Sequence, residues 1–391
     1  MRILVLGTGL QGKAALHDLA RSPSVSHVIA ADADMAGLTA YVRRLGTDKI
    51  ECVELDARDH DQVARLMQAV QAVIEQLPAT FHVPITKLAV ESGVHLVNAS
   101  YSPEEFQQIG LEAEAKQVAI LPEFGLDPGI DLVLAGQATR EFDEVHEFYS
   151  YGAGIPEPKT ANSPIKYKIS WTFEGVLKSY RRPARVLRDG RVVDIPDTEI
   201  FAEENIHTVS MEGLGLLDAF PNGDVVKYLD AMGISGTVRN AGRYAMRWAG
   251  HCAFWKKLVD LGFLDETPIQ VGTTSVSPRQ FVHDLLEPQL QYQDDERDVV
   301  VVRVDVRGFK HGQRRRVVYQ VVDWRDLDTG LMAMNRTVGY TASIGAQMIL
   351  RGDIQKCGLL SPLCDVPADI FFDELRQRGI TVQREEGEWK E

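Results

Sequence analysis

Residues Arg2 to Gly12 read Arg-Ile-Leu-Val-Leu-Gly-Thr-Gly-Leu-Gln-Gly, an apolar run that passes directly into a glycine-rich turn. The run predicts a buried β-strand, and helical periodicity begins at Gln11. The first two glycines of such a turn allow a tight bend and a close approach of the backbone to a pyrophosphate, while the third lets the helix pack against the strand. The helix N-terminus then faces the anion. The residues that we expect to bind a dinucleotide here are Gly7, Gly9, Leu10, Gln11 and Gly12.

The N-terminal third of the chain alternates between short β-rich runs and longer helical patterns. The predicted strands are Arg2–Leu6, His27–Ala31, Ile50–Glu54, Ala72–Gln76, His95–Asn98 and Val118–Leu121. The predicted helices are Gln11–Ala20, Met35–Leu45, His60–Gln68, His82–Ser92 and Glu104–Lys116. Strict alternation requires a parallel sheet with right-handed crossovers. We therefore predict a doubly wound α/β domain of the Rossmann type.

An acidic residue stands where this fold binds the adenosine ribose. Asp32 ends the second predicted strand, about 20 residues beyond the last glycine, where a carboxylate accepts hydrogen bonds from ribose hydroxyls and repels a 2'-phosphate. The sequence continues Ala33-Asp34 with no arginine, which favours NAD over NADP. Asp34 itself is expected to cap the next helix. Asp56 and Pro78 follow the third and fourth strands and are positional candidates for cofactor contact, although ordinary loop residues would fit there equally well.

A change of texture after Gly125 marks a domain boundary, so the first domain is expected to span residues 1–126. The sequence there is Gly-Leu-Asp-Pro-Gly, followed by a predicted helix over Ile130–Thr139. From this position the carboxylate of Asp127 can point into a substrate cleft. The alternative is structural, with Asp127 as the helix cap and Pro128 in the first helical position.

The rest of the chain predicts a sheet of another kind. Two β-branched runs, Asp298–Val306 and Arg315–Asp323, are joined by the turn residues 308–313 and predict an antiparallel hairpin. The other predicted elements are strands over Glu144–Tyr151 and Lys166–Thr172, a loop over residues 152–164, a helix over Gly339–Leu350 and a solvated end over residues 383–391.

Composition excludes several classes of protein. The 391 residues are 45% hydrophobic and 25% charged, which is typical of a folded globular chain, and the net charge of -14 argues against a sequence-independent nucleic-acid binder. Four scattered cysteines form no CxxC pair, and His82, His95 and His251 have no metal-ligand spacing, so we expect no metal. No apolar run approaches the roughly 20 residues of a membrane span, and no signal-peptide core is apparent, so the cytoplasm is the expected compartment.

Four spaced motifs together resemble the saccharopine dehydrogenase family, in its branch with an N-terminal Rossmann domain, over nearly the whole chain. They are residues 7–12 (Gly-Thr-Gly-Leu-Gln-Gly), 98–103 (Asn-Ala-Ser-Tyr-Ser-Pro), 125–131 (Gly-Leu-Asp-Pro-Gly-Ile-Asp) and 163–171 (Ser-Pro-Ile-Lys-Tyr-Lys-Ile-Ser-Trp). One departure is the segment at residues 151–154, Tyr-Gly-Ala-Gly, where saccharopine reductases carry Tyr-Cys-Gly-Gly.

The resemblance implies roles for particular residues. It places Ser100 and Tyr101 near the nicotinamide and makes Asp127 a substrate contact that handles protons, so Asp127 and Tyr101 are the candidate catalytic pair. The residues that it implies on the substrate side are Tyr167, Lys168, Ser170 and Trp171. A Thr-x-Arg motif, here Thr237 and Arg239, would hold a substrate carboxylate. Guanidinium binds carboxylate in a bidentate fork, although a lone arginine is more often a surface residue.

The same resemblance implies an architecture and an activity. Residues 127–334 would form an α+β substrate-binding and dimerisation domain with a mixed or antiparallel sheet, and residues 335–391 would return to the first domain in a homodimer. The implied activity is oxidation of the C–N bond of a lysine-derived amino acid, with saccharopine cleaved to glutamate and an aldehyde as the first interpretation, and Asp32 favours NAD as the cofactor. The alternatives are L-lysine 6-dehydrogenase, carboxynorspermidine dehydrogenase and an NAD-binding protein without catalysis.

Overall fold

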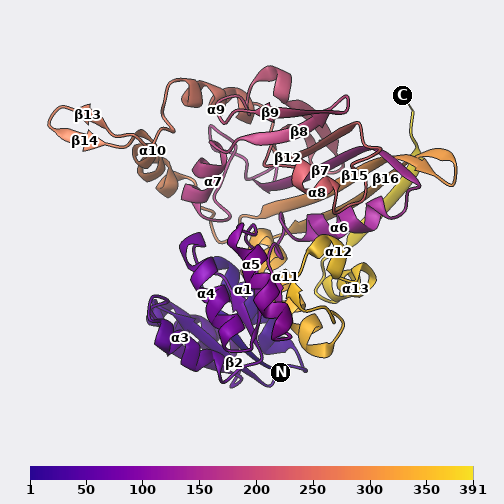
Figure 1. Ribbon diagram of the computed structural model, residues 1–391. Helices are drawn as coiled ribbons and strands as arrows, with labels where there is room; N and C mark the ends of the chain where they lie inside the picture. The colour runs from indigo at the N-terminus through magenta and orange to yellow at the C-terminus, as the bar shows by residue number, and fades with distance from the viewer. Residues whose placement is uncertain (391) are drawn as a thin grey trace. The chain divides into compact units, whose positions relative to one another are not determined.

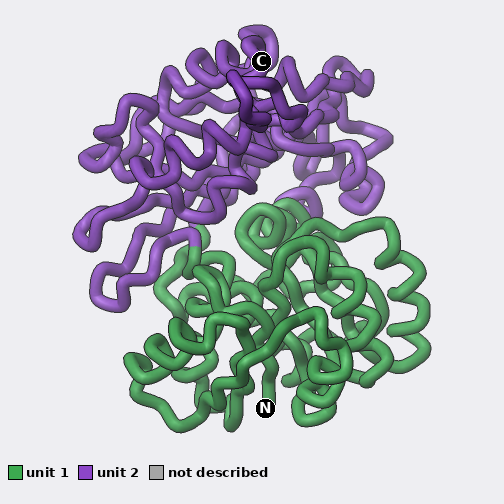
Figure 2. The backbone as a smooth tube through the Cα atoms, turned by 90° about the vertical axis from the view of Figure 1, so that its left-hand side faces the viewer, with its two compact units in different colours: residues 1–137, 335–382 green, residues 138–334, 383–391 purple. Residues whose placement is uncertain are grey.

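The computed structural model describes residues 1–390. It divides into two compact units, residues 1–137 with 335–382 and residues 138–334 with 383–391 (Figure 2). The first unit runs past the expected boundary at residue 126, because helix α6 (Ile130–Thr139) begins directly on the segment after the sheet, with the Ile130 amide bonded to the Gly125 carbonyl at 3.0 Å. Residues 383–390 belong to the second unit and do not complete the first, and Glu391, which was expected to do so as well, lies outside the described residues.

The first unit has the predicted doubly wound α/β fold (Figure 1). Its strands are β1 (Arg2–Leu6), β2 (His27–Asp32), β3 (Ile50–Glu54), β4 (Ala72–Glu75), β5 (His95–Asn98), β6 (Ala119–Leu121) and β17 (Gly358–Leu359). Its helices are α1 (Leu10–Arg21), α2 (Met35–Leu45), α3 (His60–Met67), η1 (Ala79–Phe81), α4 (His82–Glu91), α5 (Glu105–Ala115), the start of α6, most of α11 (Ala333–Arg351), α12 (Pro362–Asp365) and α13 (Ala368–Gln377). The predicted strands and helices of this region are confirmed to within one or two residues at each end.

The sheet runs in the order β17-β6-β5-β4-β1-β2-β3, and neighbouring strands are parallel. Residues 3–6 of β1 are completely buried, as expected for a central strand covered by helices on both faces. The chain proceeds from β1 toward β3, then crosses back to β4 and continues the other way. This reversal puts the switch point of the sheet at the carboxyl ends of β1 and β4, which is where open α/β sheets bind ligands.

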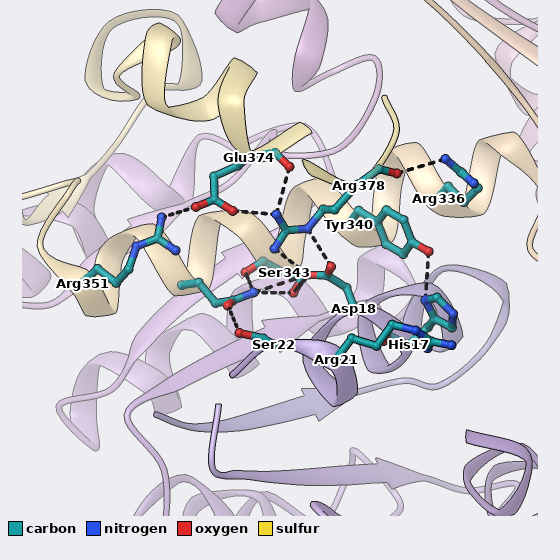
Figure 3. A network of polar contacts seen from close by, with 11 residues as sticks. His17, Asp18, Arg21, Ser22, Arg336, Tyr340, Ser343, Arg351, Glu374 and Arg378 are labelled. Carbon is teal, nitrogen blue, oxygen red and sulfur yellow. Dashed lines mark hydrogen bonds and ion pairs between the residues drawn. The ribbon is translucent and has the colours of Figure 1, made fainter. Parts of the chain in front are cut away.

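The C-terminal helices are fastened to α1 by a buried polar network (Figure 3). The carboxylate of Asp18 accepts from Arg378 Nε at 2.6 Å and from Ser343 Oγ at 2.6 Å. Arg378 also pairs with Glu374, which in turn pairs with Arg351 at 2.7 Å. Because every charge in this network has a partner, burying it leaves no uncompensated group. The predicted helix over Gly339–Leu350 is therefore confirmed as part of α11.

The second unit is built on a mixed sheet. Its strands are β7 (Glu144–Pro156), β8 (Ala184–Arg188), β9 (Arg191–Ile195), β10 (His207–Met211), β11 (Gly215–Pro221), β12 (Asn240–Trp248), β15 (Asp298–Lys310), β16 (Gln313–Trp324) and β18 (Val382–Glu388), with a separate hairpin of β13 (Ile269–Val271) and β14 (Thr274–Val276). Its helices are α7 (Phe173–Ser179), η2 (Glu203–Asn205), α8 (Val226–Leu229), α9 (His251–Asp260), α10 (Pro278–Leu286) and η3 (Glu287–Gln289). The β13–β14 hairpin projects away from the body of this unit next to α10 (Figure 1).

The main path of this sheet is β10-β11-β12-β7-β15-β16-β18, with β8 joined to β12 and β9. Strands β12 and β7 are parallel, whereas β15 pairs antiparallel with both β7 and β16. The predicted hairpin is confirmed as β15–β16.

Two local predictions in this unit are wrong. Residues 166–172 form no strand, and residues 152–156, where a loop was predicted to begin, continue β7. The charged end predicted to be solvated is exposed over residues 384–388, although these residues also belong to the strand β18, which lies beside β16. Charged side chains of β18 form ion pairs with neighbouring parts of the second unit. Arg384 and Lys310 both bind the carboxylate of Glu141, which also accepts from Tyr319 Oη at 2.6 Å.

Within residues 1–390, none of the helices is long and apolar enough to span a bilayer.

Candidate functional site

The three glycines of the motif differ in whether the surrounding protein requires a residue without a side chain. Gly7 has φ +83°, and a Cβ there would lie 2.8 Å from the Gln76 carbonyl oxygen. A Cβ on Gly12 would collide with the Gly7 carbonyl, so that glycine lets α1 pack against β1. Gly9, by contrast, has an ordinary φ of -64°, and a Cβ there would meet no protein atom within 4 Å. Nothing in the protein requires Gly9 to be glycine.

This geometry fits a dinucleotide. A glycine that the protein itself does not need is explained by a ligand that approaches the backbone closely. Gly9 is the N-cap of α1 without any side-chain cap, so the first amides of the helix are directed outward at its positive end. Residues 7, 9 and 12, together with Leu10 and Gln11 in the first turn, would hold the pyrophosphate of a pyridine nucleotide.

Asp32 is held rigidly at the end of β2. Its Oδ2 accepts from the amide and hydroxyl of Thr8, the hydroxyl at 2.9 Å, and its Oδ1 accepts from the Asp34 amide at 2.9 Å. Burial alone would raise the pKa of Asp32, but the hydrogen bonds from Asp34 and Thr8 outweigh it and lower the pKa below its ordinary value. The group is therefore an ionised acceptor. Asp34 caps α2 through the Gly37 amide at 2.9 Å, as predicted.

The two positional candidates lie on the surface. Asp56 is exposed just beyond β3 and binds Arg58, with Nη2 and Oδ2 2.7 Å apart. This hydrogen bond lowers the pKa of Asp56 to about 2. Pro78 is exposed at the start of η1, after β4. Both stand at the carboxyl edge of the sheet, and their contact with a cofactor stays a prediction.

Ser100, Tyr101 and Asp127 lie on two loops that pack against each other at the carboxyl ends of β5 and β6. The Phe124 amide donates to the Asn98 carbonyl and the Glu123 amide to the Ser100 carbonyl, both at 2.9 Å. All three candidate side chains are half-buried.

The structural alternative for Asp127 does not hold, because α6 begins at Ile130 and not at Pro128. The loop is closed instead by the Gly125 amide, which donates to the Pro128 carbonyl at 2.9 Å. Asp127 therefore lies before the first turn of α6 and not at the position that directly precedes the helix.

In the second unit, residues 165–172 are irregular but firmly held. Ser163 Oγ both accepts from the Tyr167 amide and donates to the Tyr167 carbonyl, each at 3.1 Å. The Ile169 amide donates to the Leu290 carbonyl at 2.9 Å. These contacts replace the ladder of a strand and bury Tyr167, Lys168 and Ser170.

Lys168 is already neutralised. Its Nζ lies 2.6 Å and 2.8 Å from the two carboxylate oxygens of Glu296, and both side chains are largely buried. Burial would raise the pKa of Glu296, but the hydrogen bond from Lys168 lowers it. A lysine in this state offers a substrate anion little net attraction.

The second unit contains a buried arginine with no acidic partner. Arg247 is 7% exposed, its Nη1 donates to the Met246 carbonyl at 2.8 Å, and its Nε has no hydrogen-bond partner. Among residues 1–390, the groups that act on the Arg247 charge are the side chains of Tyr180, Tyr167 and Cys252, and none of them is a carboxylate. Its register partner on β11, Asp218, accepts instead from the Gly250 amide at 2.9 Å. Burial would lower the pKa of Arg247, but the phenols of Tyr180 and Tyr167 raise it above its ordinary value.

Other buried polar atoms lack a partner near this arginine. The guanidinium carbon lies 5.4 Å from the centre of the Tyr167 ring, and the hydroxyls of Tyr167, Ser170 and Tyr292 have no partner in hydrogen-bond geometry. Ser170 Oγ lies 3.3 Å from where a Cβ of Gly154 would stand, and the register Met246↔Ala153 puts Gly154 beside Arg247. We call Arg247, Tyr167, Ser170 and Tyr292 the Arg247 cluster.

The chemistry of the cluster suits an anion. Buried charges in proteins are normally paired, and burying a polar group without a hydrogen bond costs about 1–3 kcal/mol. Burial raises the pKa of Tyr167 and of Tyr292, so both phenols stay protonated and able to donate. A carboxylate bound to Arg247 would satisfy these donors together.

The arginine singled out from the sequence lies elsewhere. Arg239 is exposed and covers the β8–β9 turn, where its Nη1 is 3.4 Å from the position of a Gly190 Cβ. Thr237 is also exposed, and its hydroxyl donates to the Ile234 carbonyl at 3.4 Å. Arg239 precedes β12 and Arg247 lies near its end, so the two stand roughly 25 Å apart along the strand. The structure does not bring Thr237 and Arg239 together with Tyr167 and Ser170.

Sequence reasoning missed Arg247, although a signal was present. It interrupts the apolar run Tyr244–Trp248 of a strand that is buried along most of its length. A charged residue inside such a run is either compensated or functional. Trp171 is half-buried near Tyr167, and its contact with a substrate stays a prediction.

Among residues 1–390, no group of three or more histidine, cysteine or acidic side chains is placed to hold a metal ion.

The fold and the glycine-rich site define a dinucleotide-binding α/β protein. A family model described as the saccharopine dehydrogenase NADP binding domain matches residues 3–121, and one described as the saccharopine dehydrogenase C-terminal domain matches residues 125–380. The chain therefore belongs to the saccharopine dehydrogenase family.

Individual relatives are distant. The mitochondrial alpha-aminoadipic semialdehyde synthase of Mus musculus is 26% identical over 97% of this chain, which is 47% of that protein. The corresponding protein of Arabidopsis thaliana is also 26% identical, over 86% of this chain and 39% of its own length. This chain thus spans less than half of these relatives.

Other relatives have a similar length. The saccharopine dehydrogenase of Saccharomyces cerevisiae described as NADP+-dependent and L-glutamate-forming is 24% identical over 97% of this chain and 98% of its own length. The solved apo structure of histidine-tagged saccharopine dehydrogenase (L-Glu forming) from the same yeast matches with a TM-score of 0.87 and 24% identity, over 99% of both chains. At this identity the structural match establishes the shared fold.

Proposed function

We propose that this protein is an NAD-dependent dehydrogenase that oxidises a C–N bond of a lysine-derived amino acid. The observation that carries the proposal is the buried, uncompensated guanidinium of Arg247 among unpartnered hydroxyls, in a chain whose other unit has a dinucleotide motif. An amino-acid carboxylate is the ligand class that such a cluster binds best. Family membership supports the same class of reaction.

The chemistry assigns tasks to residues of the first unit. A bound nicotinamide supplies the hydride acceptor. The amine must first lose its proton, because the nitrogen lone pair drives hydride departure, and an alkylammonium has a reference pKa of about 10.4. We assign proton acceptance to Asp127, with Tyr101 as a second group. Water then adds to the iminium, and the carbinolamine collapses to an aldehyde and a released amine.

We propose NAD as the cofactor, although the yeast relative is described as using NADP+. Asp32 is an ionised acceptor at the end of β2, so it can accept from a ribose hydroxyl through Oδ1 and it repels a 2'-phosphate. Ala33 and Asp34, which follow it, offer no cation.

Saccharopine is the first candidate substrate, because relatives that match this chain over nearly their full length are described as L-glutamate-forming saccharopine dehydrogenases. One observation favours free L-lysine as a second candidate. Saccharopine carries three carboxylates and calls for at least two cationic side chains to bind them. Lys168 is neutralised by Glu296, so Arg247 is the one cation that the cluster and Lys168 together leave for a substrate carboxylate.

The test is NADH formation by the purified protein, with saccharopine and L-lysine offered in parallel and NADP+ as the alternative cofactor. Turnover of saccharopine would support the L-glutamate-forming reaction, and turnover of lysine alone would establish the second candidate. Absence of turnover on both substrates with either cofactor would overturn the proposal.

We further propose that the protein is a homodimer in the cytoplasm. Light scattering of the purified protein would test the homodimer, and localisation in the source cells would test the compartment.

A further inference from the structure

A buried acid stands at the carboxyl end of β4, where the proposed reaction does not use it. Glu75 is 1% exposed and is the last residue of that strand. Strand β4 borders the switch point of the sheet, and the Gln76 carbonyl next to Glu75 contacts Gly7 of the dinucleotide motif. A carboxylate this deeply buried calls for several donors.

Three donors converge on Glu75. Oε1 accepts from the Leu77 amide at 2.9 Å, and Oε2 lies 2.7 Å from His82 Nδ1 and 3.3 Å from Asn98 Nδ2. Glu75 and Asn98 are register partners on β4 and β5, so their side chains stand next to each other. An ionised carboxylate accepts only, which matches an arrangement in which every neighbour donates.

The contacts continue from Asn98 to the candidate site. Asn98 Oδ1 accepts from the Ser100 amide at 3.1 Å, so the same orientation of the Asn98 amide group serves both contacts, with its NH2 group toward Glu75 and its oxygen toward Ser100. Ser100 and Tyr101 form the loop to which we assign substrate and proton-handling roles. A hydrogen-bonded path thus runs from Glu75 through Asn98 to the backbone of Ser100.

We propose that Glu75 is a positioning residue that sets the Ser100–Tyr101 loop through Asn98, an inference that rests on the proposed function for its kinetic consequence. The Glu75 carboxylate fixes which way the Asn98 amide faces, and that orientation presents an oxygen to the Ser100 amide. Glu75 therefore acts on the reaction without touching substrate.

The donor pattern makes one substitution decisive. In Glu75→Gln, an NH2 group must face either the Leu77 amide or the Asn98 NH2 group. If Asn98 rotates to relieve the second clash, its own NH2 group then faces the Ser100 amide. In either arrangement a buried N–H group has no acceptor. When Asn98 rotates, the Ser100 amide loses its acceptor, so the effect of the substitution reaches the Ser100–Tyr101 loop.

A second substitution should repair the first. In Glu75→Gln/Asn98→Asp, the introduced amide can accept from the Leu77 amide through its oxygen. Its NH2 group can donate both to the introduced carboxylate and to the unprotonated Nδ1 of His82. The second oxygen of that carboxylate still accepts from the Ser100 amide. The double variant keeps one negative charge and restores every donor–acceptor pair, so it separates loop positioning from a general effect of losing Glu75.

The matched control is Asp18→Asn. Asp18 is also a buried carboxylate of the first unit that accepts several hydrogen bonds, from Arg378 and Ser343, but it lies in the α1–α11 network and contacts no part of the loop. It should lower thermal stability without a specific effect on the amino-acid substrate.

The experiment has two readouts. Hydrogen exchange followed by mass spectrometry reports on the amides of residues 99–102, and steady-state kinetics reports KM for the amino acid and for NAD. We expect Glu75→Gln to speed exchange in this segment about tenfold and to lower kcat/KM for the amino acid about tenfold, consistent with one lost buried hydrogen bond. The KM for NAD should change less than about threefold, and the double variant should restore both values.

The outcomes separate the two proposals. Wild-type protein without turnover would overturn the proposed function, whereas the exchange readout would still test Glu75. Unchanged exchange and kinetics in Glu75→Gln would overturn the positioning role. So would a defect that Asn98→Asp does not repair and that Asp18→Asn reproduces, because a merely structural role gives that result.

Discussion

The guanidinium carbon of Arg247 lies 5.4 Å from the centre of the Tyr167 ring, and the Nε of the one and the hydroxyl of the other are buried without a hydrogen-bond partner. The two residues come from different parts of the second unit, β12 and the irregular segment at residues 165–172. Their contact joins a cation to a phenol that stays protonated because burial raises its pKa. This pairing leaves both groups available for an acidic ligand.

The first prediction compares the two arginines. Arg247→Met should lower kcat/KM for the amino-acid substrate by about 10²–10³-fold, since removing one partner of a buried charge pair costs roughly 3–5 kcal/mol. Arg239→Met should change it less than about threefold, because that side chain is exposed on the β8–β9 turn. Steady-state kinetics on both variants decides between them, and the reverse ranking would make Arg239 the anchor.

The second prediction concerns the cofactor. Asp32→Ser should raise the ratio of kcat/KM for NADP+ to that for NAD by about 30-fold or more, because the repulsion of a 2'-phosphate by a like charge, worth several kcal/mol, is removed. Asp34→Ser is the matched control, since Asp34 caps α2 through the Gly37 amide. An equal change of the ratio in both variants would contradict a specific role for Asp32.

The third prediction concerns proton removal. Asp127→Asn should lower kcat at pH 7 by about 10²-fold, in the range of general-base effects. The deficit should shrink as pH approaches 10, because the fraction of deprotonated amine in solution grows about tenfold per pH unit below its pKa of about 10.4. A pH–rate profile of both proteins checks this, and equal rates across the range would remove Asp127 from the role.

Much of the first unit was predictable, because parallel strands covered on both faces give continuous apolar runs. The run at residues 3–6 is completely buried, and in the glycine pattern after it Gly7 and Gly12 are each required by a close backbone approach. Asp34 as the cap of α2 also follows from local sequence alone. Signals of this kind depend on neighbours within a few residues.

The failures depend on contacts that the residue pattern does not reveal. The alternation of Tyr167, Ile169 and Trp171 imitates a strand, but the Ile169 amide bonds to Leu290, and Ser163 takes the Tyr167 amide. The charged end is exposed as predicted, but its pairing with β16 as the strand β18, and the ion pair between Arg384 and Glu141, could not be read from the local sequence. Arg239 and Arg247 cannot be ranked from composition, since only the fold shows which of them is buried.

The fourth prediction is a pH dependence of stability in the second unit. Asp298 is buried and accepts from the Ala333 and Met334 amides at 2.8 and 3.0 Å. Burial raises its pKa from an ordinary 3.8 to about 6, against the opposing pull of those amides. Between these two values the folded protein binds more protons than the unfolded chain, so the free energy of unfolding must fall as pH rises. The total change is about 3 kcal/mol.

Asp298→Asn should flatten this slope, because an amide does not titrate and still offers one oxygen to the helix. Urea unfolding at pH 4, 5, 6 and 7 measures the effect, followed by tryptophan fluorescence, since all five tryptophans lie in the second unit. The exposed Asp294→Asn is the control for loss of one charge. Equal slopes for wild type and Asp298→Asn would show that Asp298 has the same proton affinity in the folded and unfolded chain.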